Sequence, residues 1–479
     1  MAQPYRTSNP LDFTKLEGVI VSEQNPVPSV IRAGANAAVF IAQFEKGLQD
    51  TPQRVGSISE MQSYYGANQA YGGNKALRLK GWSNLYVTRA VANDAVAATT
   101  TQTVATKNLA TFTAKYKGKY GNNIKVVITD GTNATTKKIT VTLGNEVEVF
   151  DNLSLAGMTD TELAELFRTS KLIVVTAAHV SDNISNAELD LATGSDGNIS
   201  STDYDRAIKK SNINVAGKVY FTDDQSAGTK SALANFIKSE RNGICVLGAS
   251  SLDDTVATVV ADASTLQDTE GRVLYAYNPV KYNILGVIEE ENPVFLVASL
   301  LNLSAPNVSP SAAQNSVYAQ TAVGVKNQLT RTEYITLREA GIMALEDDQD
   351  LGVRIRSSVT GSNNWSVIRR RMNDFLVDSL ARYLKNYQNQ PNSLINRASI
   401  KSAIISFDEQ LVADGILPTA RDAGVPVLLV QTEGTTTPDE QAQGIQKIVY
   451  KRRIFAELKF IVLETTVGES VTVENVEGA

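Results

Sequence analysis

The chain has 479 residues, of which 43% are hydrophobic and 20% are charged, a composition typical of a soluble, folded protein. Because one hydrophobic core rarely serves more than roughly 100–200 residues, we expect about three domains. The net charge of −6 argues against a nucleic-acid binder, which needs a basic face, and the single cysteine excludes an intrachain disulfide framework and a cysteine-rich zinc site.

The N-terminal residues lack the apolar core of a secretory signal, and no run of about 18 uninterrupted apolar residues occurs in the sequence. We therefore expect synthesis and folding in a cytoplasm, without membrane insertion. Residues 1–23 read as a polar arm that turns into a short strand at 16–23. Because a lone strand leaves its backbone groups unpaired, this strand needs a sheet in its own chain or in another chain.

Strands alternate with helices in two separate stretches, residues 24–95 and 204–345, which we assign to one α/β core domain. The first stretch contains an apolar strand at 37–42, a helix start near Ser59 and a strand at 84–91. In the second stretch we expect strands at 217–221, 243–248 and 272–276, helices at 229–239 and 256–268, and a buried helix at 293–301. This alternation predicts a sheet with parallel pairs.

Residues 96–203 differ in character, because alternating Thr-rich runs replace the apolar strands. Residues 97–101 are interpreted as a linker, and 125–129 and 138–143 as strands of a hairpin around the turn at 130–133. We expect a mostly β domain inserted into the α/β core.

The C-terminal part, residues 346–466, contains the clearest helix, whose apolar side chains recur at three- and four-residue steps from Ile368 to Leu384. A second helix is expected to end near Gly415, followed by strands at 425–431 and 445–466. We assign this part to a C-terminal α+β domain and 467–479 to a C-terminal arm with one strand. The predicted fold class is therefore α/β (α+β) and multidomain.

Sequence patterns of catalysis are missing. The chain has no G-x-x-x-x-G-K-[ST] loop, no G-x-G-x-x-G after a strand and no G-x-S-x-G. Asp347, Asp348 and Asp350 resemble a calcium loop only loosely, so a solvated acidic turn is favoured. Cys245 lies in an apolar run and is expected to be buried, and His179 has no second histidine with which to share a metal. We predict no catalytic residues, no metal site and no cofactor.

Two basic clusters remain, one at Arg369, Arg370 and Arg371 and one at residues 451–453. Three consecutive arginines on a helix cannot share one face, so at least one points away from the core. A solvated face is the simpler interpretation. The functional alternative is a positive stripe that docks on an acidic surface of another protein.

Several segments, in order along the chain, resemble the tail sheath family of contractile phages, tailocins and related injection machines. Residues 18–23 are similar to the family's "GVYVEE" segment, and 117–123 to its "pGxWGN" element, with Tyr120 in place of tryptophan. Residues 339–342 and 351–355 resemble segments before the C-terminal helix. Residues 365–371 resemble the "wryInvRR" signature, and 411–417 resemble "l...GaL". The resemblance covers nearly the whole chain.

This resemblance implies a non-enzymatic, structural subunit that polymerises helically around a tail tube and contracts to drive the tube through a target cell envelope. It implies self-association, with tail tube, baseplate and tail terminator proteins as further partners, and a place in the virion tail. The family's terminal arms add strands to sheets of neighbouring subunits. The residues that the resemblance assigns to strand exchange are Val19, Ile20, Val21, Val471, Thr472 and Val473, and those it suggests for contact with the tube are Arg369, Arg370 and Arg371.

Two alternatives from other classes stay open at this point. The Thr-rich insert also suits an adhesin or another filament-forming surface protein, although the missing signal sequence speaks against it. The α/β pattern also suits an enzyme with a β accessory domain, which a pocket with converging titratable groups would favour.

Overall fold

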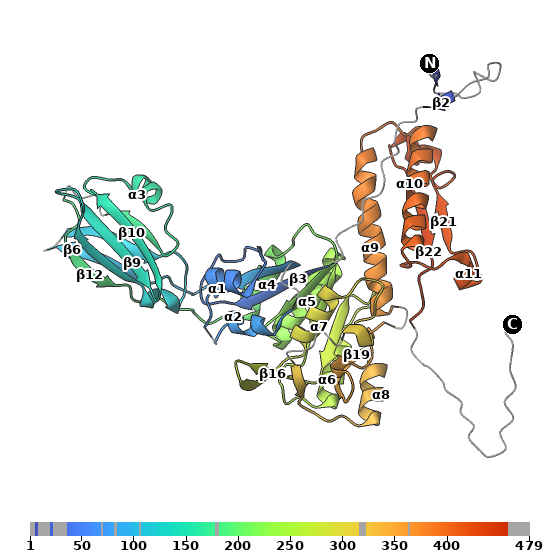
Figure 1. Cartoon of the computed structure of the whole chain (residues 1–479), viewed down its shortest axis with the longest axis horizontal. Helices are drawn as coiled ribbons and strands as arrows, with labels where there is room; N and C mark the ends of the chain where they lie inside the picture. Colours follow the sequence, from blue (N-terminus) through green and yellow to red (C-terminus); the bar gives the residue numbers. More distant parts are fainter. Residues whose placement is uncertain are drawn as a thin grey trace. The chain divides into compact units, whose positions relative to one another are not determined.

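The computed structural model describes residues 5–7, 20–22, 36–68, 70–80, 84–104, 107–177, 182–315, 322–362 and 365–457. The chain forms two compact units, one of residues 31–386 and one of residues 1–30 together with 387–479 (Figure 1). The boundary predicted at residue 346 falls inside a strand of the larger unit, β19 (Ile342–Asp348).

An eight-stranded sheet forms the centre of the larger unit, in the order β20-β19-β15-β14-β13-β3-β5-β4. The six inner strands run parallel, and the edge strands β4 and β20 run antiparallel to their neighbours. The parallel pairs expected from the sequence are thus confirmed. Besides β19, the strands are β3 (Ala37–Gln43), β4 (Gln53–Val55), β5 (Leu85–Ala90), β13 (Lys218–Thr222), β14 (Ile244–Leu247), β15 (Val273–Tyr277) and β20 (Gly352–Ile355).

Helices cover both faces of this sheet, and strand β3 shows why. Its residues alternate between two buried clusters, Phe40 in one and Val39 and Ile41 in the other, as a period of two requires. The buried helix expected at 293–301 is confirmed as α7 (Val294–Leu303), which packs on one face. The other face carries α4 (Ser201–Lys210), α5 (Ala227–Glu240), α6 (Val256–Leu266) and α8 (Arg331–Glu339).

Shorter elements complete the core part of this unit. A three-stranded antiparallel sheet has the order β17-β16-β18. The elements are β16 (Val280–Ile284), β17 (Val287–Glu291), β18 (Ala322–Val325), α1 (Ile58–Tyr65), α2 (Gly72–Lys75) and the 3-10 helix η2 (Ala76–Arg78).

Two antiparallel sheets, ordered β10-β9-β8-β12 and β11-β7-β6, pack around a separate hydrophobic cluster in the insert. The linker expected at 97–101 is wrong from Thr99 onward, because β6 begins there. Its threonines pair with β7, and the hydroxyls of Thr101 and Thr111 lie 2.9 Å apart. The elements are β6 (Thr99–Val104), β7 (Lys107–Ala114), η4 (Lys119–Asn123), β8 (Lys125–Asp130), β9 (Lys137–Leu143), β10 (Glu146–Leu153), α3 (Asp160–Leu166), β11 (Ile173–Ala177) and β12 (Ala187–Asp190).

Arg89 of β5 joins the core to the insert, although its side chain is almost fully buried. It donates hydrogen bonds to the carbonyl oxygens of Phe44 and Gly47, both at 3.0 Å, in the loop after β3. A further bond of 2.7 Å reaches the carbonyl oxygen of Lys117 in the insert. One guanidinium group therefore serves backbone oxygens on both sides of the junction, which the planar five-donor group of arginine can do and lysine cannot.

The remaining helices confirm the amphipathic segments expected near the C-terminus. Helix α9 (Val367–Leu384) belongs to the larger unit, and α10 (Leu394–Ala413) to the smaller one. Of the strand expected at 445–466, only β22 (Val449–Arg452) forms within the described residues, and 458–466 lie outside them. The other elements are β1 (Tyr5–Thr7), β2 (Ile20–Ser22), η6 (Lys385–Tyr387), α11 (Ala420–Ala423), β21 (Leu428–Gln431) and α12 (Pro438–Ala442).

We predict that Arg89→Met lowers the free energy of unfolding by about 3 kcal/mol, because it leaves buried carbonyl oxygens without donors. Arg168→Met is the control, since Arg168 lies on the surface of the insert and pairs only with Glu165, an exposed pair worth about 0–1 kcal/mol. Urea denaturation of both variants measures the difference. Equal stabilities would contradict the role assigned to Arg89.

Candidate functional site

The three arginines singled out in the sequence lie in the first turn and a half of α9. Ser366 caps this helix, because its hydroxyl accepts a hydrogen bond from the backbone N–H of Arg369. Successive helical residues point about 100° apart, so the three side chains leave the helix in different directions. Arg369 is exposed, whereas Arg370 and Arg371 are 3% and 6% exposed.

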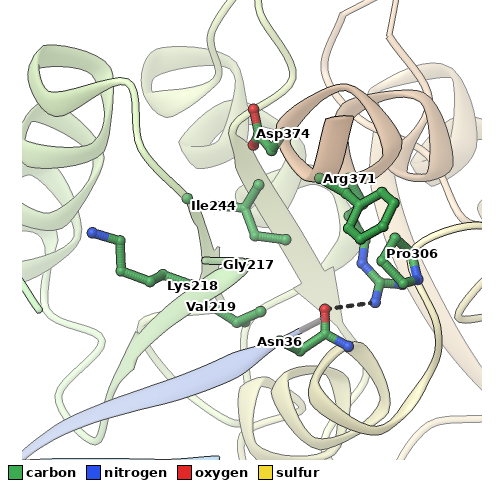
Figure 2. A pocket seen from close by; sticks show the side chains of 10 residues that line it. Asn36, Gly217, Lys218, Val219, Ile244, Pro306, Arg371 and Asp374 are labelled. Atoms are coloured by element: carbon green, nitrogen blue, oxygen red, sulfur yellow. Dashed lines mark hydrogen bonds between the residues drawn. The ribbon is translucent and has the colours of Figure 1, made fainter. Parts of the chain in front are cut away.

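Arg371 reaches the C-terminal end of α7. Its guanidinium donates to the carbonyl oxygens of Leu301 at 2.9 Å and Ser304 at 2.5 Å, and to the Ser304 hydroxyl at 3.0 Å. It also donates to the side-chain oxygen of Asn36 at 3.1 Å, a bond drawn in Figure 2. The amide nitrogen of Asn36 in turn donates to Ser304 and to Asn302. Asn36, just before β3, and Arg371 therefore cap α7 together.

This arrangement satisfies a buried cation without a carboxylate among the oxygens that it contacts. The last carbonyl oxygens of a helix have no partners within the helix and carry the negative end of its dipole, so a cation is favourable there. Burial lowers the pKa of Arg371 to about 10, which still leaves the group charged at neutral pH. The bond set fastens α9 to the core sheet through α7 and Asn36.

A second set of contacts that holds α9 to the core lies one turn further along the helix, at Asp374. Its carboxylate accepts two hydrogen bonds from Arg272, at 3.1 and 3.3 Å, and forms an ion pair with Arg370. Arg272 immediately precedes β15 and also donates to the carbonyl oxygen of Gly243, before β14. The guanidinium of Arg370 stacks on Trp365, 4.5 Å from the ring centroid.

The interpretation of residues 369–371 as one exposed positive stripe is therefore wrong for two of the three. Arg370 and Arg371 are turned inward because acceptors from α7, β3 and α9 itself meet them there. Arg369 remains outside, and its guanidinium lies 4.8 Å from the ring centroid of Trp365. Arg369 is the exposed residue of this run, and its contact with a tube stays a prediction.

The small pocket beside this junction lies at the amino-terminal ends of β3, β13 and β14 (Figure 2). In open α/β sheets ligands bind at the opposite, carboxyl ends of the strands. Figure 2 shows Lys218 pointing away from Arg371, and its ammonium donates to Asn212 and to the carbonyl oxygen of Ile213. The charged groups that line this pocket are thus engaged within the protein, and we assign the pocket to the α9 junction.

The second basic cluster, residues 451–453, also has one side chain turned inward and two turned to solvent. In the smaller unit the side chain of Arg452 is only 1% exposed and donates to the carboxylate of Asp408 on α10 at 2.7 Å and to the carbonyl oxygen of Pro418 at 2.9 Å. Lys451 and Arg453, on either side, are exposed. Alternation along β22 therefore turns Arg452 to the helix and its two neighbours outward.

The other groups weighed in the sequence give no reactive centre within the described residues. Cys245 is fully buried in β14, and burial raises its thiol pKa. Asp348 accepts backbone hydrogen bonds from Asp350 and Leu351, as a turn residue does. Among the residues that the structure describes, no three His, Cys, Asp or Glu side chains are grouped to hold a metal ion. His179 lies outside them.

The structure places part of the N-terminal strand-exchange segment. Ile20 and Val21 lie in β2, which pairs in parallel with β1 of the same chain, Tyr5 opposite Ile20. Val19 and the C-terminal residues Val471, Thr472 and Val473 lie outside the described residues. Exchange of these strands between subunits stays a prediction.

The smaller unit holds a sheet of only two strands in its described part, β21 and β22, with four residues each. Val430 and Tyr450 are paired across the sheet, and the phenol of Tyr450 donates to Asp408 of α10. Leu429 is 40% exposed and pairs with exposed Lys451. Since two strands are marginally stable alone, this sheet is suited to accept further strands.

Sequence reasoning missed Asn36, Arg89 and Arg272. The four-residue spacing from Arg370 to Asp374 is the one signal that predicts part of the junction, because residues four apart are neighbours on a helix. Nothing local marks the remaining residues, since their partners are distant in sequence.

We predict that Arg371→Met lowers the free energy of unfolding by about 3 kcal/mol, because several buried oxygens lose their donor. Arg369→Met, on the same helix, should cost less than half as much, because the side chain of Arg369 is exposed to solvent. Chemical denaturation of the two variants provides the measurement. An equal loss in both would refute the division between buried and exposed arginines.

No family model and no curated protein matches the sequence. Among solved structures, the sheath tail protein of Listeria innocua matches 84% of this chain and 90% of its own, with 15% identity and a TM-score of 0.61. The sheath tail protein of Desulfitobacterium hafniense matches 91% of this chain and 100% of its own, with 16% identity and a TM-score of 0.59.

A third match extends the likeness to an assembled state. The helical sheath of the anti-feeding prophage in its contracted state matches 95% of this chain and 99% of its own, with 14% identity and a TM-score of 0.54. The resemblance stated from sequence segments is thus confirmed at the level of the fold. Over nearly its whole length, this chain has the fold of contractile sheath proteins.

Proposed function

We propose that this chain is the structural subunit of a contractile tail sheath. Subunits polymerise helically around a tail tube and contract to drive the tube through the envelope of a target cell. The observation that carries this proposal is the fold that the chain shares with solved sheath proteins over 84–95% of its length. One of these matched structures is a helical sheath in the contracted state. A match over so much of the chain extends well beyond the common α/β sheet.

The small sheet of the second unit supports assembly by strand exchange. β21 and β22 have partners only in each other among the described residues, and an apolar side chain, Leu429, is exposed on them. Arms from neighbouring subunits, with strands at residues 19–21 and 471–473, would extend this sheet through backbone hydrogen bonds. Such head-to-tail contacts do not close on themselves, so they build a helix of subunits.

The arms also suit a transition between two states. Strand pairing holds subunits together while the linkers before and after the strands bend, so that subunits rotate and pack more tightly without detaching. In this proposal the extended sheath is metastable, and a kinetic barrier holds it until a baseplate releases it.

Further partners follow from this function: the tail tube protein inside the sheath, and baseplate and tail terminator proteins at its ends. The subunit needs no cofactor, no nucleic acid and no catalytic residue. It would be made in a bacterial host cytoplasm and act in the tail of a phage or a tailocin. None of the helices in the described ranges is long and apolar enough to cross a membrane.

The test is electron microscopy of the purified protein at increasing concentration. Hollow helical tubes or stacked rings are expected for the full chain. Deletion of residues 469–479 should leave a folded monomer that no longer polymerises, because the donated strand is lost. Compact monomers of the full chain at every concentration, or normal tubes from the truncated chain, would contradict the proposal or its arm mechanism, respectively.

A separate prediction concerns the sheath–tube contact. Arg369 is the exposed arginine of the α9 run, so Arg369→Glu is expected to weaken co-assembly with the tube protein while tube-free sheath polymers form normally. Each such contact is worth only about 0.2–1 kcal/mol, and repetition over many rings amplifies it. Pelleting of mixed sheath and tube protein measures the effect, with Arg168→Glu in the insert as the control. Unchanged co-pelleting would exclude Arg369 from the contact.

A further inference from the structure

The tip of the hairpin of β16 and β17 carries the most exposed of the large apolar side chains in the described residues of the α/β core. Leu285, in the two-residue turn, is 94% exposed, and Val287 and Ile288 at the start of β17 are 59% and 64% exposed. Val323 of the neighbouring β18 is 50% exposed. β17 is one of the two edge strands of this three-stranded sheet. The side chains of Leu285, Val287 and Ile288, at the tip of the hairpin, are called the hairpin patch below.

The turn itself is built from an unfavourable residue. Leu285 has φ +52° and Gly286 has φ +88°, the two positive values of a type I′ turn. Asparagine is preferred at the first position, because its short polar side chain tolerates the left-handed conformation that strains leucine. Here the chain carries leucine at that position and presents it to water. Both the strain and the exposure oppose folding, so neither is explained by the stability of the monomer.

Charge does not account for the patch either. The three glutamates that follow it in β17 are engaged within the protein. Glu289 and Glu291 pair with Arg78, which is buried, and Glu290 pairs with Lys326 at 3.0 Å. All three glutamates are therefore engaged in ion pairs at the base of the hairpin, whereas its tip presents apolar side chains.

We infer that the hairpin patch is a contact between copies of this chain, in which Leu285 inserts into an apolar site of the next copy; this inference rests on the proposed sheath function. The size of the patch favours this occupant. Three exposed side chains offer on the order of 300 Å², less than half of what one partner buries in a stable two-protein complex. Such a contact is too small to hold a dimer in solution. It is effective in a lattice of identical subunits, where each subunit makes several contacts at once.

The test uses the full chain and a double variant, Leu285→Asn with Ile288→Thr. The asparagine suits the type I′ turn, so the melting temperature should stay equal or rise, while the concentration needed for tube formation should increase about tenfold or more. Val147→Thr with Val149→Thr is the matched control. These valines, 59% and 53% exposed, also lie on an edge strand, β10, and their change should leave assembly unaltered. In parallel, a photo-crosslinking benzoylphenylalanine replaces Leu285 and should link one copy to another.

The outcomes separate this inference from the proposed function. If the wild type and the Leu285 double variant form tubes at the same protein concentration, the hairpin contact is overturned and the sheath function stands. If the wild type forms no tubes, the sheath function fails, and crosslinking decides the hairpin: links between copies at high concentration support the contact, and their absence overturns it. If tubes form but the crosslinker at position 285 links only residues of the same chain, the hairpin contact is also overturned.

Discussion

The binding of the α7 C-terminus by Arg371 and Asn36 is the interaction on which the arrangement of the larger unit depends. Asn36 stands at the entry to the central strand β3, α7 covers one face of the sheet, and Arg371 comes from α9. One set of hydrogen bonds thus fixes a strand, a helix of the core and the long helix at the end of the unit. Asp374 and Arg272 add a second fixed point one turn away. A helix held at two points acts as a rigid arm of the core, which suits a protein whose proposed work is to transmit movement.

Arg89 joins segments in a similar way at the junction between the α/β core and the insert. Here too a buried guanidinium satisfies carbonyl oxygens from segments that meet without regular pairing. Both sites use arginine where several backbone oxygens converge, because a planar group with five donors reaches more acceptors than any other side chain. Away from these junctions, the described residues of the two-stranded sheet of β21 and β22 and of the hairpin tip expose apolar side chains, Leu429 and Leu285 among them.

Regular structure with a strong periodic pattern was predictable from the sequence. The parallel strands, α7 and α9 follow from apolar runs and from three- and four-residue steps, since burial of one face dictates the pattern. The strand β6 was missed because a Thr-rich run reads as a linker until its partner β7 is known. The burial of Arg370 and Arg371 was missed for a related reason. Arg371 meets Ser304, 67 residues away, and Asn36, 335 residues away, and no local pattern records acceptors at such separations.

The chemistry of the Arg371 contact has a consequence for how the particle tolerates its surroundings. The oxygens around this guanidinium belong to peptide carbonyls, an amide and a hydroxyl, and none of these takes up a proton between acid and neutral pH. The hold of α9 on the end of α7 therefore does not depend on the protonation state of a carboxylate, and these hydrogen bonds persist in acid as they do at neutral pH.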